Sequence, residues 1–529
     1  MRTMYAVLLD VTGIQRYVFE SSRLKGNIGA SFLVEEVYRD LLQEALQETV
    51  GHAVSLDDWK TGGDARIYKD SAIDVEVASI GGGSALILFR DDKGKKFVSR
   101  WTEKLLLQAP GLRTAVALGS LEEGDRFSAG VNKLYETLQS NKNSIFPEVE
   151  LPRHGITQDC LLSGGGAEVL YKDADGESKH ISAAMQAKME AALRGNRHLQ
   201  KLFAEELGEK YAFTDQLDQL GQVTGKNYIA LVHIDGNNMG ELFRKCGKPE
   251  ERRRLSLQVA QGAEQAFRSL LKDIVSEYEA YSEKDGILEF APSHAGGKEV
   301  LPIRPIILGG DDITFVSHGQ LGLLYAERYM RHLLKHLLTE KELPFHSCAG
   351  VAIIKTSYPF FRGYRLAEAL CASAKKKARE QGGGSWLDFY TVHGEVSGGL
   401  EAMKREEYQG VRGNLHFGPY CLNSSREASF EELLQGISFF QNGAGGKSDK
   451  SAPWPRNKVK ELRGFLKGTE HDMALFLRDR KLQGCMLPAL ENLSVYAKSG
   501  WSEQRTPYFD MIELLEFMPS MALKGREKA

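Results

Sequence analysis

The chain has 529 residues and a mass of 58.8 kDa, more than one hydrophobic core normally supports, which predicts roughly three to four compact units. Hydrophobic residues make up 42% and charged residues 26% of the sequence, a composition that excludes a mainly disordered chain. Because 68 basic residues stand against 71 acidic ones, the formal net charge is -3, and any contact with nucleic acid must be local.

The sequence gives no sign of a membrane segment or of secretion. The longest apolar runs, such as residues 303–308, are far shorter than the roughly 20 residues that cross a bilayer. The N-terminus reaches Asp10 before a signal-type apolar core develops. The cysteines form no C-x-x-C pair, so neither a zinc knuckle nor a disulfide framework is indicated. We therefore expect a cytoplasmic protein without membrane contact.

The first part of the chain predicts a strand, helix, hairpin, helix, strand series. An apolar run ends at Asp10, and apolar residues recur at helical spacing over 30–46. The glycine-rich segment Gly81 to Ser84 separates two strand-like runs and so predicts a hairpin turn. In chain order the predicted elements are strand 4–9, helix 30–46, strand 73–80, turn 81–84, strand 85–89, helix 96–107 and strand 112–118.

The same series recurs in the second half of the chain. Its predicted elements are strand 228–234, helix 251–281, strand 303–308, turn 309–312, strand 313–317, helix 321–338 and strand 346–354. Asp10 precedes Gly83 by 73 positions, and Asp235 precedes Asp311 by 76. A β-α-β-β-α-β unit of the ferredoxin-like type places its first strand beside the hairpin. We therefore expect Asp235 to face Asp311 and Asp312.

This duplication predicts an α+β fold with two ferredoxin-like domains, an intervening helical segment and a helical C-terminal domain. Residues 122–220 are rich in helix formers with a break at 163–166, and a loop-like segment at 442–455 interrupts the helical C-terminal region. The predicted limits are 1–120 for the first ferredoxin-like domain, 121–225 for the mainly helical segment, 226–400 for the second ferredoxin-like domain and 401–529 for the C-terminal domain.

The turn Gly309-Gly310-Asp311-Asp312 of the second unit combines a permissive backbone with acidic side chains. Glycine lets a triphosphate approach the backbone, and these carboxylates together with Asp235 offer the oxygen ligands that Mg²⁺ prefers. Two ions about 4 Å apart would activate a 3′-hydroxyl and stabilise leaving pyrophosphate, which is nucleotidyl transfer chemistry. Gly and Asp are also common in ordinary solvated turns, but the second acidic motif, Ile234 to Gly240, favours the catalytic interpretation.

Several longer motifs point to one family. They are Asp10 to Phe19, Ser22 to Lys25, Gly29 to Ser31, Ile234 to Gly240, Gly309 to Asp312, Ala367 to Lys375 and Gly418 to Tyr420. With these motifs the chain resembles the large, palm-domain subunit of type III CRISPR effector complexes, the cyclic oligoadenylate synthase of the Csm and Cmr systems. The resemblance implies that both repeats are palm domains, the second of them catalytic. It also implies conversion of ATP to cyclic or linear 3′-5′ oligoadenylates in antiviral defence.

The resemblance further implies roles for individual residues. Two ATP molecules would sit between the palms, and Asp235, Asp311 and Asp312 would be catalytic and bind two Mg²⁺ or Mn²⁺ ions. The implied nucleotide-binding residues are Gly309, Gly310, Asn238, Gly240, Lys375, Gly82, Gly83 and Ser84. Lys375 falls where related domains place a phosphate-binding lysine, and a solvated last helical turn at 375–377 is an equal alternative.

The first palm keeps Asp10 but has Gly83 and Ser84 where the second has Asp311 and Asp312. One carboxylate cannot hold two metal ions, so we expect this palm to bind the acceptor nucleotide. A palm kept only for packing is the alternative interpretation.

The chain also departs from the family pattern. The first palm starts at residue 4, so we expect no His-Asp nuclease domain, and the segment between the palms holds only Cys160, so no zinc site is expected there. Asn237 stands where the family commonly has an acidic residue, so we expect either a weaker metal site or different hydrogen bonding, with Asp235 retained.

The implied partners are guide RNA and target RNA, bound through a multi-subunit Csm/Cmr-like complex, and small CRISPR subunits. Charge does not predict RNA binding, because the basic runs Arg252 to Arg254 and Lys375 to Lys377 are short and more often coat a helix. Two other functions are open: a catalytically silent scaffold subunit of an RNA-guided complex, and a GTP-using cyclase of the diguanylate type.

Overall fold

A computed structural model describes most of the chain. The described residues are 3–21, 23–56, 59, 67–122, 126–143, 156, 158–172, 176–281, 290–338, 345–394, 398–423, 425–443 and 454–519. Ser22 of the family motif and most of the predicted loop at 442–455 lie outside these residues. None of the helices in the described ranges combines the length and the apolarity needed to cross a bilayer.

The first sheet has the strand order β2-β3-β1-β4 that a ferredoxin-like unit requires. Its strands are β1 (Thr3–Thr12), β2 (Val75–Gly81), β3 (Ser84–Phe89) and β4 (Arg113–Glu122), and its helices are α1 (Ile14–Phe19), α2 (Leu24–Tyr38), α3 (Asp40–Val50), α5 (Gly94–Gln108) and α6 (Phe127–Asn143). Successive residues of β1 belong to different apolar clusters: Val7 belongs to the cluster that contains Trp101 of α5, and Leu8 to the cluster that contains Val131 of α6. Both faces of the sheet are therefore covered.

The second sheet repeats this arrangement and extends it to the order β11-β12-β8-β13-β14-β17. Its elements are β8 (Tyr228–Gly236), α9 (Met239–Lys245), α10 (Pro249–Tyr281), β11 (Ile303–Leu308), β12 (Asp312–His318), α11 (Gly322–Leu338), β13 (Ser347–Lys355), α12 (Phe360–Glu380), β14 (Trp386–Thr391) and β17 (Tyr420–Cys421). Gly322 of α11 lies against Ala230, and Gly363 of α12 lies against Leu231. Neighbouring residues of a strand face opposite sides, so α11 and α12 cover opposite faces.

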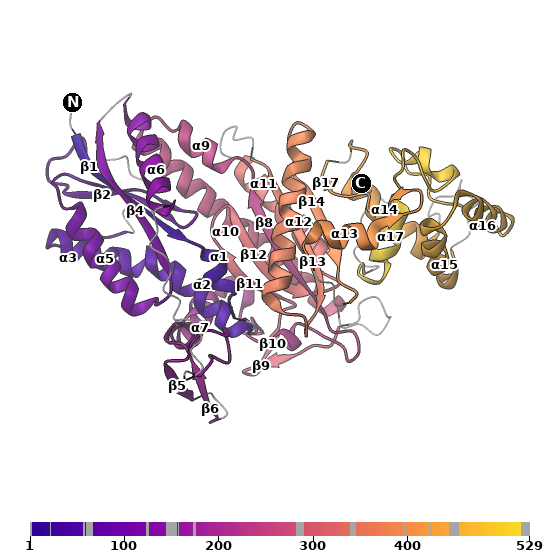
Figure 1. The fold of residues 1–529 in the computed structure, drawn as a ribbon, viewed down its shortest axis with the longest axis horizontal. Helices are drawn as coiled ribbons and strands as arrows, with labels where there is room; N and C mark the ends of the chain where they lie inside the picture. Colours follow the sequence, from indigo (N-terminus) through magenta and orange to yellow (C-terminus); the bar gives the residue numbers. More distant parts are fainter. Residues whose placement is uncertain are drawn as a thin grey trace.

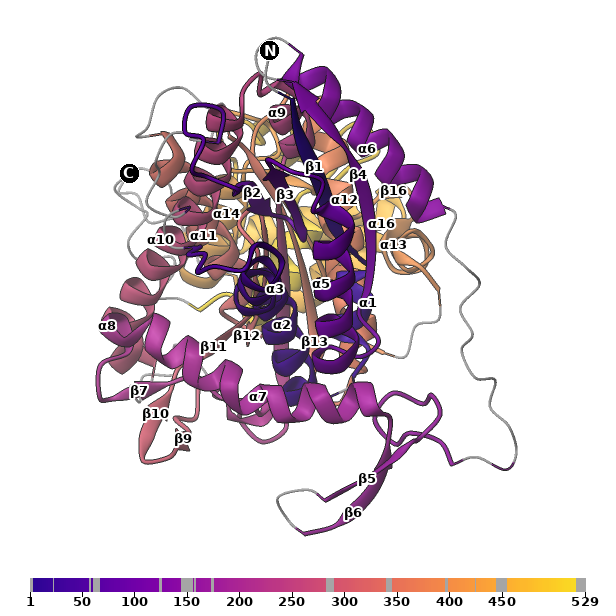
Figure 2. The ribbon, with the colours of Figure 1, turned by 90° about the vertical axis from the view of Figure 1, so that its left-hand side faces the viewer.

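The remaining elements belong to the segment that connects the two sheets, to the stretch between α10 and β11, and to the C-terminal part of the chain. They are β5 (Val169–Lys172), β6 (Ser178–Ile181), α7 (Ala183–Leu202), α8 (Ala204–Leu207), β7 (Tyr211–Ala212), η1 (Leu217–Gln219), β9 (His294–Ala295), β10 (Lys298–Val300), α13 (Leu400–Tyr408), β15 (Gln409–Gly410), β16 (Gly413–Asn414), α14 (Phe430–Asn442), α15 (Arg456–Lys467), α16 (Glu470–Leu482), η2 (Ser494–Lys498), α17 (Tyr508–Glu513) and η3 (Leu514–Glu516). The first sheet, the second sheet and the C-terminal helices follow one another along the molecule (Figure 1). The β5–β6 hairpin projects beyond α7 (Figure 2).

The predicted α+β fold with two ferredoxin-like units is confirmed, and the domain limits stay a prediction. The single helix predicted at 30–46 is wrong, because the chain forms α2 and α3 with a break at Arg39. The backbone of Arg39 has φ -106° and ψ -77°, and its N–H still donates to the carbonyls of Glu35 and Glu36. Apolar spacing continues across this change of direction, so periodicity did not reveal it. The β5–β6 hairpin inside the segment predicted as mainly helical was also not foreseen.

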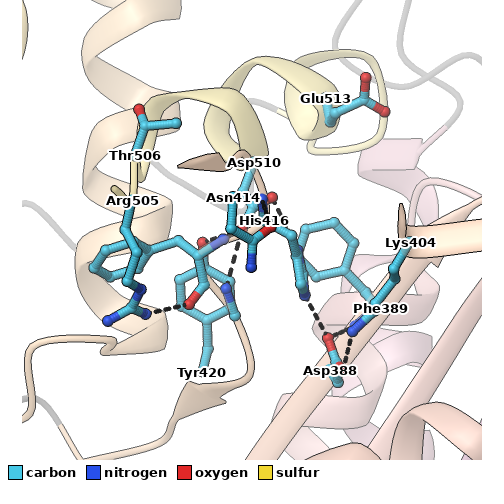
Figure 3. Close-up of polar contacts among 12 residues, drawn as sticks. Asp388, Phe389, Lys404, Asn414, His416, Tyr420, Arg505, Thr506, Asp510 and Glu513 are labelled. Atoms are coloured by element: carbon cyan, nitrogen blue, oxygen red, sulfur yellow. Dashed lines mark hydrogen bonds and ion pairs between the residues drawn. The ribbon is translucent and has the colours of Figure 1, made fainter. Parts of the chain in front are cut away.

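A buried group of charges joins the second sheet to the C-terminal helices (Figure 3). His416 lies between two fully buried carboxylates: its Nε2 donates to Asp388 of β14 at 2.7 Å and its Nδ1 to Asp510 of α17 at 3.0 Å. An ionised carboxylate only accepts hydrogen bonds, so both ring nitrogens donate and His416 is an imidazolium. Lys404 of α13 donates to Asp388 at 2.7 Å, and two cations thus balance two carboxylates.

These contacts shift the pKa values in opposite directions. Burial by itself lowers the pKa of His416, but Asp510 and Asp388 outweigh it, so the pKa of His416 is raised. Burial would raise the pKa of Asp388, but Lys404 and His416 hold that pKa well below its usual range. Asp510 is further held by Tyr420, whose hydroxyl donates to it at 2.6 Å.

We predict that His416→Gln lowers the free energy of unfolding by about 3–5 kcal/mol, because one lysine then faces two buried carboxylates. The folded-state pKa of His416 lies above its ordinary value of about 6.5. Its stabilisation is therefore complete below that pH and is lost as the pH rises through the folded-state pKa. Denaturant unfolding at several pH values should show that the difference in the free energy of unfolding between wild type and His416→Gln becomes smaller toward alkaline pH. His471 is exposed, so His471→Gln is the matched control. A difference in the free energy of unfolding that does not change with pH would contradict the prediction.

Candidate functional site

The glycine-aspartate turn of the second sheet is a tight two-residue hairpin. The Gly309 N–H donates to the carbonyl of Asp312 at 2.9 Å, so Gly310 and Asp311 form the turn itself. Gly310 has φ +84°, the left-handed conformation that favours glycine at the first position of a type II′ hairpin turn. The turn fixes Asp311 at the tip and Asp312 as the first residue of β12.

Antiparallel pairing brings the third carboxylate to the same place. Asp235 of β8 is the direct cross-strand partner of Asp312, and the Gly236 N–H donates to the carbonyl of Asp311 at 3.0 Å. The structure thus brings together Asp235, Asp311 and Asp312, which are far apart in the sequence. Their catalytic and metal-binding roles stay predictions. Carboxylates placed directly opposite each other in a sheet repel, so folding alone does not favour this arrangement.

The electrostatics of the cluster reflect this repulsion. Burial and the neighbouring Asp235 raise the pKa of Asp311 to about 6, and burial together with Asp235 and Asp311 raises the pKa of Asp312 to about 8. His233 has its Nδ1 at 3.4 Å from Asp312 Oδ1, but burial lowers the pKa of His233 to about 4, so this ring is neutral near pH 7. Asp312 Oδ1 has no hydrogen-bond partner among the described residues. The side chains of Asp312 and Asp235 keep 30% and 36% of their surface exposed, which leaves the cluster accessible to a ligand.

Lys375 of α12 supplies the cation of this site. Its Nζ lies 2.5 Å from Asp235 Oδ2 and donates to the Gly236 carbonyl at 3.1 Å. The alternative of a merely solvated last helical turn is therefore wrong for Lys375, whereas Lys376 is exposed. One lysine beside three carboxylates leaves an excess of acidic groups.

The other predicted residues of the second palm flank the cluster. Asn238 adopts the left-handed conformation, with φ +59°, and precedes α9. A Cβ built on Gly240 would meet no atom within 4 Å, whereas one on Gly309 would lie 3.1 Å from the Asp312 carbonyl. Asn237 points away from the carboxylates, because its side-chain amide donates to the Gly384 carbonyl at 3.3 Å.

The first palm has the same hairpin in a less charged form. Gly82 and Gly83 have φ +57° and +74°, as both central residues of a type I′ turn require. Asp10 is the cross-strand partner of Ser84, in the register that pairs Asp235 with Asp312. The Ser84 hydroxyl donates to the Gly81 carbonyl at 3.0 Å. The repeat thus extends to the pairing of single residues.

A second lysine, which the sequence interpretation missed, completes the duplication. Lys142 Nζ forms an ion pair with Asp10, as Lys375 does with Asp235. Burial raises the pKa of Asp10, and Lys142 opposes that rise. The signal was present in the sequence: α6 and α12 both begin with Phe, and each lysine stands 15 positions after that residue.

The two hairpin turns lie against each other. A Cβ built on Gly82 would be 3.9 Å from Oδ1 of Asp311, and one on Gly81 would be 3.7 Å from the hydroxyl of Ser256 in α10. Both palms therefore present their turns to one shared site. The second palm contributes the acidic cluster, and the first palm contains the Asp10–Lys142 pair.

The donor set fits a divalent cation that arrives with phosphate. Within the described ranges no three His, Cys, Asp or Glu side chains are arranged as a ready-made metal site. Mg²⁺ usually takes only one or two carboxylates together with water and substrate phosphate. The partly exposed carboxylates and the unpartnered Oδ1 of Asp312 are oxygen donors of this kind.

Comparison with known proteins finds a family match for part of the chain and a similar fold for the whole of it. Residues 228–382 match the family described as Cas10/Cmr2, second palm domain, so this part of the chain is a palm domain. The chain thus includes a segment similar to the second palm domain of the Cas10/Cmr2 family. No match was found among curated proteins.

Solved structures extend the similarity to the whole chain. A chain of the Csm1–Csm4 cassette in complex with AMPPNP aligns with a TM-score of 0.51 and 14% identity, over 99% of this chain and 70% of that one. Csm1 in T. onnurineus aligns with a TM-score of 0.50 and 14% identity over the same shares. At this identity the likeness shows the fold.

We predict that Asp312→Asn raises the free energy of unfolding in metal-free buffer by up to about 1 kcal/mol, because it removes one of two facing carboxylates. Chemical denaturation in the presence of a chelator measures the effect. The exposed Asp218→Asn is the control and should leave stability unchanged. A loss of stability in Asp312→Asn would show that the carboxylate is stabilised by its surroundings.

Proposed function

We propose that the protein is a nucleotidyltransferase that converts ATP to cyclic or linear 3′-5′ oligoadenylates and releases pyrophosphate. The observation that carries this proposal is the acidic cluster of the second palm facing the glycine turn of the first. Oligomerisation needs two nucleotides side by side, one to present a 3′-hydroxyl and one to present an α-phosphate. Two palms whose turns touch provide that arrangement within a single chain.

In the second palm, Asp235, Asp311 and Asp312 would hold two Mg²⁺ or Mn²⁺ ions. When bound, such ions lower the barrier by activating the attacking hydroxyl and by neutralising charge on the phosphates. Gly309 and Gly310 would let the phosphates approach the backbone. Lys375 would offset triphosphate charge, because its Nζ already lies at the acidic cluster. Asn238 and Gly240 would border the nucleotide at the start of α9.

In the first palm the charges suit a nucleotide without its own pair of metal ions. Gly82 and Gly83 allow close approach, and Ser84 adds a hydroxyl. Lys142 would contact phosphate in the position that Lys375 takes in the second palm. This palm would hold the acceptor nucleotide, whose 3′-hydroxyl would attack the α-phosphate of the nucleotide held by the second palm and release pyrophosphate.

The solved relatives support both the substrate and the setting of this proposal. The AMPPNP complex noted above and a Csm1–Csm4 cassette in complex with pppApApA, with a TM-score of 0.51 and 14% identity, share this fold. By analogy we propose that this chain binds ATP and works in a type III CRISPR complex with a Csm4-like partner, small subunits, guide RNA and target RNA.

We predict that the purified protein with ATP and Mn²⁺ or Mg²⁺ yields pyrophosphate and adenylate oligomers, detected by mass spectrometry with and without guide and target RNA. The double variant Asp311→Ala/Asp312→Ala should reduce turnover to background, because both metal-binding side chains of the turn are lost. Asp218→Asn should keep wild-type turnover. If the complete complex with RNA makes no product, the scaffold function replaces this proposal, and preferential use of GTP in competition would indicate a diguanylate-type cyclase.

We predict that Lys142→Ala raises the KM for ATP roughly tenfold or more, because a charge-assisted contact to phosphate is lost. Steady-state kinetics at saturating metal measures this change. Lys133→Ala, an exposed lysine on the same helix, is the matched control. Unchanged KM in Lys142→Ala, together with unchanged turnover in Ser84→Leu, would support a first palm that serves only for packing.

A further inference from the structure

The free edge of the first sheet is covered by a helix of the second palm. β2 is an outer strand of its sheet. The edge of β2 that has no neighbouring strand faces the N-terminal part of α10. Arg253 donates to the Val77 carbonyl at 2.8 Å, and the Ser256 hydroxyl donates to the Ile80 carbonyl. An outer strand carries unpaired backbone groups, so α10 supplies hydrogen bonds that a neighbouring strand would otherwise make.

Arg252 forms the centre of this contact, because all three guanidinium nitrogens donate to different elements. Nε donates to the Ser79 hydroxyl of β2 at 3.0 Å, and Nη1 donates to the Phe243 carbonyl of α9 at 3.2 Å. Nη2 donates to the hydroxyl of Tyr135 in α6. The planar, rigid guanidinium can satisfy three such directions at once, which a flexible ammonium group cannot do. Arg252 therefore joins two elements of the first palm to two of the second.

The contact is buried as well as polar. Arg252 is 2% exposed, Arg253 5%, Ser256 3% and Ser79 6%, and Arg253 forms a 2.5 Å ion pair with Glu76. The basic run at 252–254 was interpreted from the sequence as a helix surface. That interpretation is wrong for its first two residues and holds only for Arg254, which is exposed. Buried, paired arginines of this kind are unavailable to RNA.

The same face of α10 continues to the acidic turn. One helical turn beyond Ser256, Val259 lies 3.5 Å from a Cβ built on Gly310. At the other end of the contact, Ser79 and Ile80 lead directly into the turn that places Gly82 against Asp311. A single rigid helix thus touches the strand that carries one turn and the backbone of the other.

We propose that Arg252, Arg253 and Ser256 of α10 form an inter-palm clamp that sets the register between the two hairpin turns and so aligns the two nucleotides for transfer. Arg252 and Ser256 are positioning residues, because they contact neither turn tip nor any of the three carboxylates. This inference rests on the proposed function. A misplacement of reacting groups by about 1 Å can slow a reaction roughly 100-fold while each group still binds, so loss of the clamp should affect transfer more than binding.

The test compares Arg252→Lys with Arg254→Lys, both made in the full chain. Arg252→Lys keeps the charge but loses the three-way hydrogen bonding, and we expect kcat for pyrophosphate release to fall roughly 10- to 100-fold. Binding of an ATP analogue with a methylene bridge between the α- and β-phosphates should stay within about twofold of wild type. Amide hydrogen exchange across residues 76–84 should become faster, because β2 loses the contact between Ser79 and Arg252. Arg254→Lys should match wild type in all three measurements.

Each other result contradicts the clamp. Wild-type kcat in Arg252→Lys would show that the register does not depend on the guanidinium. A parallel loss of analogue binding and of thermal stability would show a general structural role. If Arg252→Lys does not fold, Ser79→Ala and Tyr135→Phe each remove a single contact of Arg252. For these variants we expect a smaller fall in kcat and a smaller increase in hydrogen exchange, with unchanged binding of the ATP analogue. Hydrogen exchange needs no activity, so it tests the clamp even if wild type makes no oligoadenylate, which would instead refute the proposed function.

Discussion

The cross-strand pairing of Asp235 with Asp312 is the constraint on which the rest of the site depends. Two carboxylates held face to face at the end of a sheet, with Asp311 beside them, oppose folding unless a cation or a ligand offsets them. Among the described residues, the cluster is paired with one lysine, Lys375, and lies beside a histidine that is neutral. The remaining strands and helices make the arrangement rigid, since β8 is paired on both sides, by β12 and β13. The free energy gained by packing in the rest of the fold thus offsets the repulsion among these three carboxylates.

The two palms share one backbone arrangement but differ in the number of acidic side chains at their turns. Each keeps an aspartate at the end of its central strand and a lysine fifteen positions into the helix that covers it. They differ at the turn, where Ser84 and Gly83 replace two carboxylates. The first palm therefore balances one acid with one base, and the second keeps an excess of acid. This asymmetry is consistent with the roles that we propose, an acceptor nucleotide in the first palm and a metal-bound donor nucleotide in the second.

Local patterns predicted most of this architecture, and contacts between remote segments account for what they missed. The strand and turn positions followed from apolar alternation and from glycine pairs, which act over a few residues. The break at Arg39 depends on how α2 and α3 pack, which spacing does not encode. Arg252 looked like a surface residue because the strand that buries it comes from the other palm. The His416 group combines Asp388 and Asp510, which no short motif connects. Lys142 could have been predicted from the sequence, because it occupies the same position in the first repeat as Lys375 does in the second.

The cover that α10 gives to β2 also affects whether the two halves of the chain are separable. A fragment ending before α10 would leave the outer strand of the first sheet bare, with open amide and carbonyl groups that can recruit another chain and start aggregation. A fragment beginning at β8 would carry two arginines without their buried partners, which is costly. The two palms therefore share buried hydrogen bonds that neither could make alone, in spite of their sequence repeat.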